Sequence, residues 1–174
     1  MTELAEPIGL GQREQAVLDR LVSARVRVNW ETAAYAALVV VAASMRFWDL
    51  GSRAFHHDES LHAWRAWQLF DGLGYQHEPW MHGPVQFFGT ALSFFLFGVG
   101  DYTARIPLAV FGSALVALPW FLRNRLGTAG ALLLSAGIAF SPTLLYFSRF
   151  AHPDSYMALF TLGLVVCLWR YIDE

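Results

Sequence analysis

Residues 128–147 read TAGALLLSAGIAFSPTLLYF and contain no charged side chain. A transmembrane helix needs roughly 17–25 mostly apolar residues, so this stretch is long enough to cross a bilayer, and its Pro142 is tolerated there. Similar apolar runs lie on both sides of it, at residues 32–48, 104–122 and 155–172. The sequence therefore predicts an all-α integral membrane protein with about four transmembrane helices.

The composition excludes several other classes of protein. Of the 174 residues, 56% are hydrophobic and only 15% are charged, with a formal net charge of −2. No basic surface remains for binding nucleic acid. All 12 positively charged side chains are arginines, so Schiff-base and P-loop chemistry, which need a lysine, are excluded. The single Cys167 can form neither an internal disulfide nor a cysteine zinc site.

The polar stretches divide the chain into two regions. Residues 1–30 are charged and amphipathic and are expected to lie at the cytoplasmic side, and residues 31–174 form the membrane bundle. Within the bundle, 49–103 is a large external loop that carries helices at about 59–71 and 84–97. The second of these is apolar but shorter than a usual span, so it is expected to lie flat.

The number of spans decides which side chains can meet. The basic pair Arg123 and Arg125 fits a cytoplasmic turn, and the distribution of arginines slightly favours four spans. Four spans place Asp58 and Asp154 on the same external face. If residues 84–97 cross the membrane instead, these two carboxylates lie on opposite faces and cannot share a site.

The first polar cluster is FHHDES at residues 55–60. Asp58 has the position of a helix N-cap, and Glu59 falls in the first turn, where a carboxylate is favoured by the helix dipole. Capping alone is one interpretation. The other is that Asp58 acts as a general base or a metal ligand, because His57 and a second histidine precede it in an otherwise apolar loop.

The second cluster is SRFAHPD at residues 148–154. Arg149, His152 and Asp154 lie at the start of a span and fit a site for an anionic head group, since arginine can hold a phosphate with two hydrogen bonds. The alternative is that Asp154 caps the helix and Arg149 reaches the lipid head groups. A third stretch, with His82 just before Pro84, is either a functional loop or a membrane anchor.

A metal site is a weaker alternative. Asp58, Asp154 and His57 could together hold a divalent ion, but neighbouring residues rarely all reach one ion. The sequence has no HExxH pattern and no serine in the setting of a nucleophile.

The segments FHHDESLHAW, YQHEPWMHGPVQFF, DYTARIP and SPTLLYFSRFAHPDSYMALF follow one another in an order and spacing that resemble a known superfamily. These are the membrane glycosyltransferases that use polyprenyl-phosphate sugars, including protein O-mannosyltransferases and aminoarabinose transferases. The nearest resemblance is to the flippase-activity-associated family of archaeal-type N-glycosylation. It covers about residues 30–174.

The resemblance implies a helical bundle whose first external loop carries two juxtamembrane helices. It also implies that Asp58 is the catalytic aspartate, with Glu59 beside it, and that Asp154 is a second acidic position preceded by Arg149. His82 stands where some relatives carry a lysine. Members of this superfamily are several times longer, so the chain is expected to be an N-terminal fragment or one part of a split gene, inactive without its missing C-terminal part.

The expected function is therefore the catalytic-loop region of an inverting glycosyltransferase at the external face of the plasma membrane. It would move a sugar from a polyprenyl-phosphate donor to an acceptor, with Arg149, His82, His57 and His152 contacting substrate and membrane lipids as further partners. Two alternatives stay open: a non-catalytic partner in the translocation or presentation of lipid-linked sugars, and a histidine-rich metal-handling membrane protein.

Overall fold

The computed structural model describes residues 29–74 and 83–173, and within these residues every regular element is a helix. In chain order they are α2 (Trp30–Phe47), α3 (His57–Phe70), α4 (Pro84–Phe97), α5 (Asp101–Ala117), the 3-10 helix η2 (Leu118–Leu122), α6 (Arg123–Phe140), α7 (Pro142–Phe147) and α8 (Asp154–Asp173). The amphipathic segment expected near the N-terminus lies almost wholly outside the described residues.

The ends of the helices follow local rules. Asn29 caps α2, because its Oδ1 accepts a hydrogen bond of 2.8 Å from the amide of Thr32. Helix α4 begins with Pro84, whose missing N–H costs nothing in the first turn, and stops at Gly98, where φ is 84°. The bounds of α4 are those that the sequence predicted.

The apolar run at residues 128–147 does not form one helix. Helix α6 ends at Phe140, and Ser141 adopts φ −57° and ψ 120° before Pro142 opens the short α7. A residue that precedes proline is pushed out of the helical region, which is the physical reason for the break. Gly127 makes a second break, with φ 71°, between the first turn of α6 and the rest of it.

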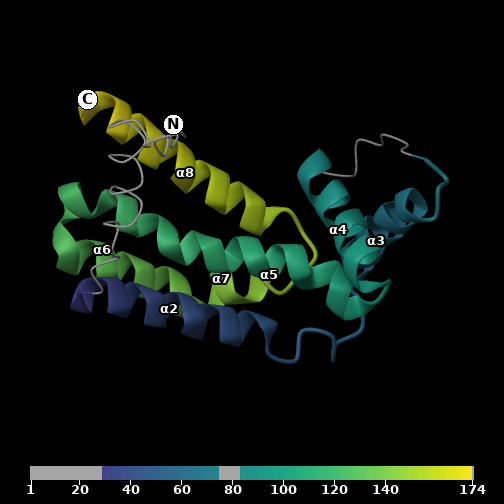
Figure 1. Ribbon diagram of the computed structural model, residues 1–174. Coiled ribbons are helices and arrows are strands. Elements are labelled where there is room, and N and C mark those ends of the chain that lie inside the picture. The colour runs from purple at the N-terminus through teal and green to yellow at the C-terminus, as the bar shows by residue number, and fades with distance from the viewer. Residues whose placement is uncertain (1–28, 75–82, 174) are drawn as a thin grey trace, which may run out of the picture.

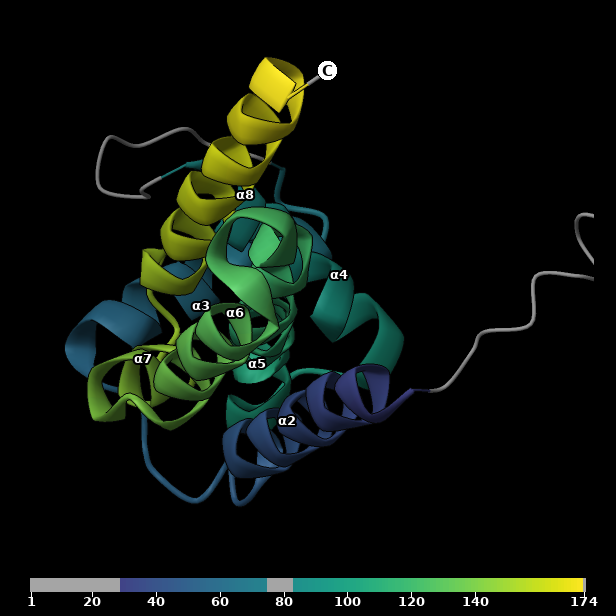
Figure 2. The same cartoon turned by 90° about the vertical axis from the view of Figure 1, so that its left-hand side faces the viewer.

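The four longer described helices lie lengthwise beside one another, with α3 and α4 gathered at one end of this bundle (Figure 1). Helices α2 and α6 run in one direction, and α5 and α8 run in the other. The segments that join α2 to α3 and α7 to α8 therefore both lie toward the end that carries α3 and α4. Figure 2 shows that α8 leans away from the other helices along its length.

By length and composition, two helical stretches of the described residues could cross a membrane: Asp101–Phe140 and Asp154–Asp173. The first contains α5, η2 and α6, and the chain reverses direction within it (Figure 1). Small side chains allow close packing at the centre of the bundle, where a buried cluster joins α2, α5 and α6; it consists of Ala42, Leu115, Val116, Ile138 and Ala139.

Candidate functional site

The centre of the site is a buried ion pair between α3 and α5. Arg105 donates from Nε to Glu59 Oε1 at 2.7 Å and from Nη2 to Glu59 Oε2 at 2.9 Å. Both residues have 0% exposure to solvent. This two-bond geometry is the strongest that an arginine and a carboxylate can form.

Backbone amides complete the shell around Glu59. The N–H of Ala151 donates to Oε1 at 2.9 Å, and the N–H of His56 donates to Oε2 at 3.0 Å. Burial alone would raise the pKa of Glu59, but the hydrogen bonds from Arg105 and from these two amides hold that pKa below its usual value. Glu59 is therefore a fixed carboxylate anion whose oxygens already have partners.

Arg105 also fixes the chain that leads into α3. Its Nη1 donates to the carbonyls of Leu50 at 3.0 Å and Arg53 at 2.9 Å, and its guanidinium lies 4.9 Å from the centre of the Phe55 ring. One side chain thus holds the segment after α2, the first turn of α3 and, through Glu59, the loop before α8. The pair joins the two loops in which the sequence placed its polar clusters.

Asp58, next to Glu59, points the other way. Its side chain is 52% exposed, and its Oδ2 lies 3.6 Å from Nδ1 of His56. The same His56 nitrogen accepts a long hydrogen bond of 3.4 Å from the Asp58 amide. Asp58 is thus an exposed carboxylate on a helix start that the buried Glu59–Arg105 pair holds in place.

Asp154 is the first residue of α8, and its side chain contacts a histidine two positions earlier in the chain. His152 Nδ1 lies 2.6 Å from Asp154 Oδ2. The two histidine–aspartate pairs approach each other across one aromatic side chain, because the ring of Phe150 lies 5.7 Å from that of His56 and 6.2 Å from that of His152. The structure therefore brings the two predicted polar clusters to one end of the bundle.

The remaining predicted residues are placed differently. His57 is exposed in the first turn of α3, and His82 lies outside the described residues. No three metal-ligating side chains converge anywhere in the described part of the chain. Asp58, Asp154 and His57, which were predicted as possible ligands of one divalent ion, therefore do not converge in the structure.

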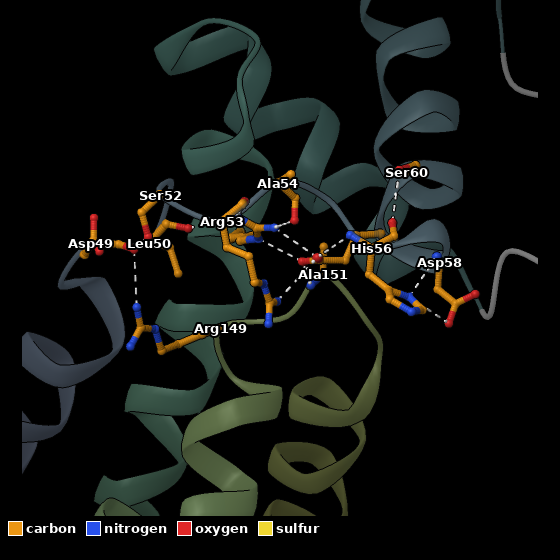
Figure 3. A network of polar contacts seen from close by, with 12 residues as sticks. Asp49, Leu50, Ser52, Arg53, Ala54, His56, Asp58, Ser60, Arg149 and Ala151 are labelled. Atoms are coloured by element: carbon orange, nitrogen blue, oxygen red, sulfur yellow. Dashed lines mark hydrogen bonds and ion pairs between the residues drawn. The ribbon is translucent and has the colours of Figure 1, made fainter.

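Arg149 lies on the far side of this network from Asp58. Its Nη2 donates to the carbonyl of Trp48 at 2.7 Å and to that of Asp49 at 3.3 Å. Figure 3 shows Arg149 with Asp49 on one side and His56 with Asp58 on the other, with Arg53 and Ala151 between them. The predicted base and the predicted phosphate ligand are thus separated.

A cavity of about 460 Å³ lies beside Arg149 and is also lined by Arg53 and Arg105, two arginines that sequence reasoning did not select. Arg53 has a half-exposed side chain, 3.5 Å from Glu59 Oε2, and its guanidinium lies over the rings of Tyr146 at 5.5 Å and Phe150 at 5.4 Å. Arg53 and Arg105 both line this cavity and both contact Glu59, so they connect the cavity with the Glu59 region. Asp49 also lines the cavity.

Sequence reasoning also missed Arg105, although a signal for it existed. Arg105 stands in DYTARIPLAVF, just inside an apolar run, and a charged residue in such a place almost always has a buried partner. The sequence could not say which of the adjacent acids Asp58 and Glu59 that partner is.

These features define an all-helical membrane protein with an acidic and basic site at one end of its bundle. A family model described as dolichyl-phosphate-mannose-protein mannosyltransferase matches residues 81–174, and the chain belongs to this family of membrane glycosyltransferases that use polyprenyl-phosphate sugar donors. The match includes Arg105, Arg149 and Asp154 and begins after Asp58. Comparisons with curated proteins and with solved structures found no match.

Proposed function

We propose that this chain carries the catalytic loop of an inverting glycosyltransferase that moves a hexose, with mannose as the first donor sugar to test, from a polyprenyl phosphate to an acceptor hydroxyl. The observation that carries the proposal is the exposed Asp58 carboxylate on a helix start locked by the buried Glu59–Arg105 pair. A catalytic group needs to be held in place by its surroundings, and this pair supplies that support.

In the proposed reaction, Asp58 takes the proton of the acceptor hydroxyl. The freed oxygen attacks the anomeric carbon, and the bond between that carbon and the phosphate oxygen breaks with inversion. The polyprenyl phosphate leaves with the electron pair. An ionised aspartate is a weak base, so it suits a reaction whose leaving group, a phosphate, is a good one.

The charge that grows on the departing phosphate needs a cation. Arg53 is placed better for this than Arg149, because Arg53 touches Phe150 and approaches Glu59 while Arg149 is bonded to the end of α2. Arg149 then becomes a positioning residue that ties the loop after α7 to the segment after α2. His152 and Asp154 form the opposite edge of the site and orient the substrate.

We expect Arg53→Gln to lower the rate of sugar transfer by at least about tenfold, since loss of one group that stabilises developing negative charge costs about that much or more. Arg149→Gln should have a smaller effect. The assay follows radiolabelled mannose from polyprenyl-phosphate mannose to acceptor in membranes that express the complete gene. Arg53→Lys keeps the charge and should recover part of the rate. A larger loss in Arg149→Gln than in Arg53→Gln would reverse this assignment.

The proposal also requires a topology in which α2, α5, α6 and α8 each span the membrane, with Asp58 and Asp154 on the external face. The chain has a single cysteine, Cys167, which makes a direct test simple. After Cys167→Ala, a cysteine introduced at position 58 and one at position 154 should both react with an impermeant maleimide added to intact cells. Labelling of only one of the two positions would refute the four-span arrangement.

A further inference from the structure

A buried positive charge near the end of α2 takes no part in the site described above. Arg46 has 0% exposure to solvent. Its Nη1 donates to the carbonyl of Ala42 at 3.1 Å and its Nη2 to that of Ile138 at 3.4 Å. These carbonyls carry only partial charges, and Arg46 forms no ion pair with any carboxylate of the described residues. An uncompensated charge in an apolar interior is costly, so a counter-ion would stabilise it.

One donor of Arg46 is entirely without a partner. Its Nε is buried and makes no hydrogen bond within the described part of the chain. The Nε faces Gly112 of α5, where an added Cβ would lie 3.1 Å from Nε and 2.3 Å from Cβ of Ser148. No larger residue fits at position 112 without a shift, and glycine there leaves the guanidinium its place beside α5.

A cavity of about 250 Å³ lies next to this guanidinium, between α2, α5, α7 and the start of α8. Its walls combine apolar side chains with two hydroxyls and one acid; the residues are Arg46, Gly112, Leu115, Thr143, Leu144, Phe147, Asp154 and Ser155. The acid, Asp154, is already paired with His152 at 2.6 Å, and its side chain is 47% exposed. Arg46 is the charged residue of this lining whose side chain is fully buried.

We propose that this cavity binds the phosphate group of a lipid. Arginine presents a planar set of donors that matches phosphate oxygens, and Thr143, which carries a hydroxyl, lines the same cavity. The apolar side chains Leu115, Leu144 and Phe147 suit the chain that a lipid phosphate carries. The inference goes beyond the proposed transfer reaction, since it needs neither a sugar nor Asp58.

The test measures binding of phosphatidic acid to the delipidated protein in an uncharged detergent, by native mass spectrometry and by the shift in melting temperature. We expect the wild type to bind phosphatidic acid and not diacylglycerol, and Arg46→Gln to bind it at least about tenfold more weakly, because charged hydrogen bonds are lost. Arg170→Gln, an exposed arginine at the other end of α8, is the matched control and should bind as the wild type does.

Further variants separate the outcomes. Asp154→Asn should bind phosphatidic acid more tightly, because it removes a like charge, and Arg46→Lys should bind several-fold more weakly. Equal affinity of these two variants and the wild type would overturn the proposal even if Arg46→Gln fails to fold. Loss of binding in Arg53→Gln instead of Arg46→Gln would place the phosphate in the other cavity and also overturn it.

Two comparisons identify the source of the phosphate and keep this proposal apart from the transfer reaction. Inorganic phosphate is the first comparison. If it raises the melting temperature of the wild type as much as phosphatidic acid does, and Arg46→Gln abolishes that rise, the lipid ligand is contradicted. Asp58→Asn should leave the affinity for phosphatidic acid unchanged. Transfer without this binding, or this binding without transfer, would each reject only one of the two proposals.

Discussion

Asp58→Asn is expected to lower the rate of sugar transfer by about 10²–10⁴-fold, the usual loss when a general base is removed. Asparagine has nearly the same size and can still form polar contacts at the start of α3, but it cannot accept the proton of the acceptor hydroxyl. The measurement is transfer from polyprenyl-phosphate mannose in membranes that express wild-type or variant protein to equal levels.

The matched control is Asp71→Asn, which changes an exposed carboxylate at the other end of the same helix. It should leave the transfer rate within about twofold of the wild type, as expected for a surface group remote from the reaction. Retention of more than about a tenth of the rate by Asp58→Asn would eliminate the base role. The chain would then fit better with a partner that presents lipid-linked sugars.

The second large effect concerns stability. Arg105→Met leaves Glu59 buried without its partner, and breaking a buried ion pair in this way costs about 3–5 kcal/mol of unfolding free energy. The loss appears as a lower melting temperature in detergent. Adding Glu59→Leu to Arg105→Met should recover part of it, because the isolated buried charge is gone while the amides of His56 and Ala151 still lack an acceptor.

The control for this experiment is Arg53→Gln. The contact of Arg53 with Glu59 is long, at 3.5 Å, and half-exposed, so its removal should cost less than about 1 kcal/mol. If Arg53→Gln destabilises the protein as much as Arg105→Met does, Arg105 is not the principal partner of Glu59.

The pH dependence of stability follows from the same pair. The folded-state pKa of Glu59 lies below its unfolded value of about 4.3, so its contribution is fully present above that pH and is lost as the pH falls through the folded-state pKa. Arg105→Met should therefore lose stability less steeply than the wild type on acidification below about pH 4.

Much of the helical plan could be predicted from the sequence. The length of its apolar run, with the proline and glycine at its ends, predicted the bounds of α4. The polar clusters around Asp58 and Asp154 also lie at one end of the bundle. The break at Ser141 was not predicted, because apolar composition continues through Pro142 and only backbone geometry interrupts the helix there.

The site could be predicted only in outline. Asp58 and Glu59 are neighbours with the same chemistry, and which of them faces inward depends on the rotation of α3. The buried face of that helix consists of Glu59, His62, Ala63 and Ala66, whereas the large side chains of Leu61 and Trp64 are exposed. A prediction from the large apolar residues would therefore have taken the wrong face of α3 as the buried one, because it is the small residues of α3 that pack against α4 and α5.

The partners of Glu59 also set an order of assembly during synthesis. Arg105 and Ala151 follow Glu59 by 46 and 92 positions in the chain. A ribosome that has just made α3 has therefore not yet made either group that fixes it. The first turn of α3, with Asp58, therefore reaches its final position only after the segment before α8 has emerged, when the chain has already passed through α5 and α6.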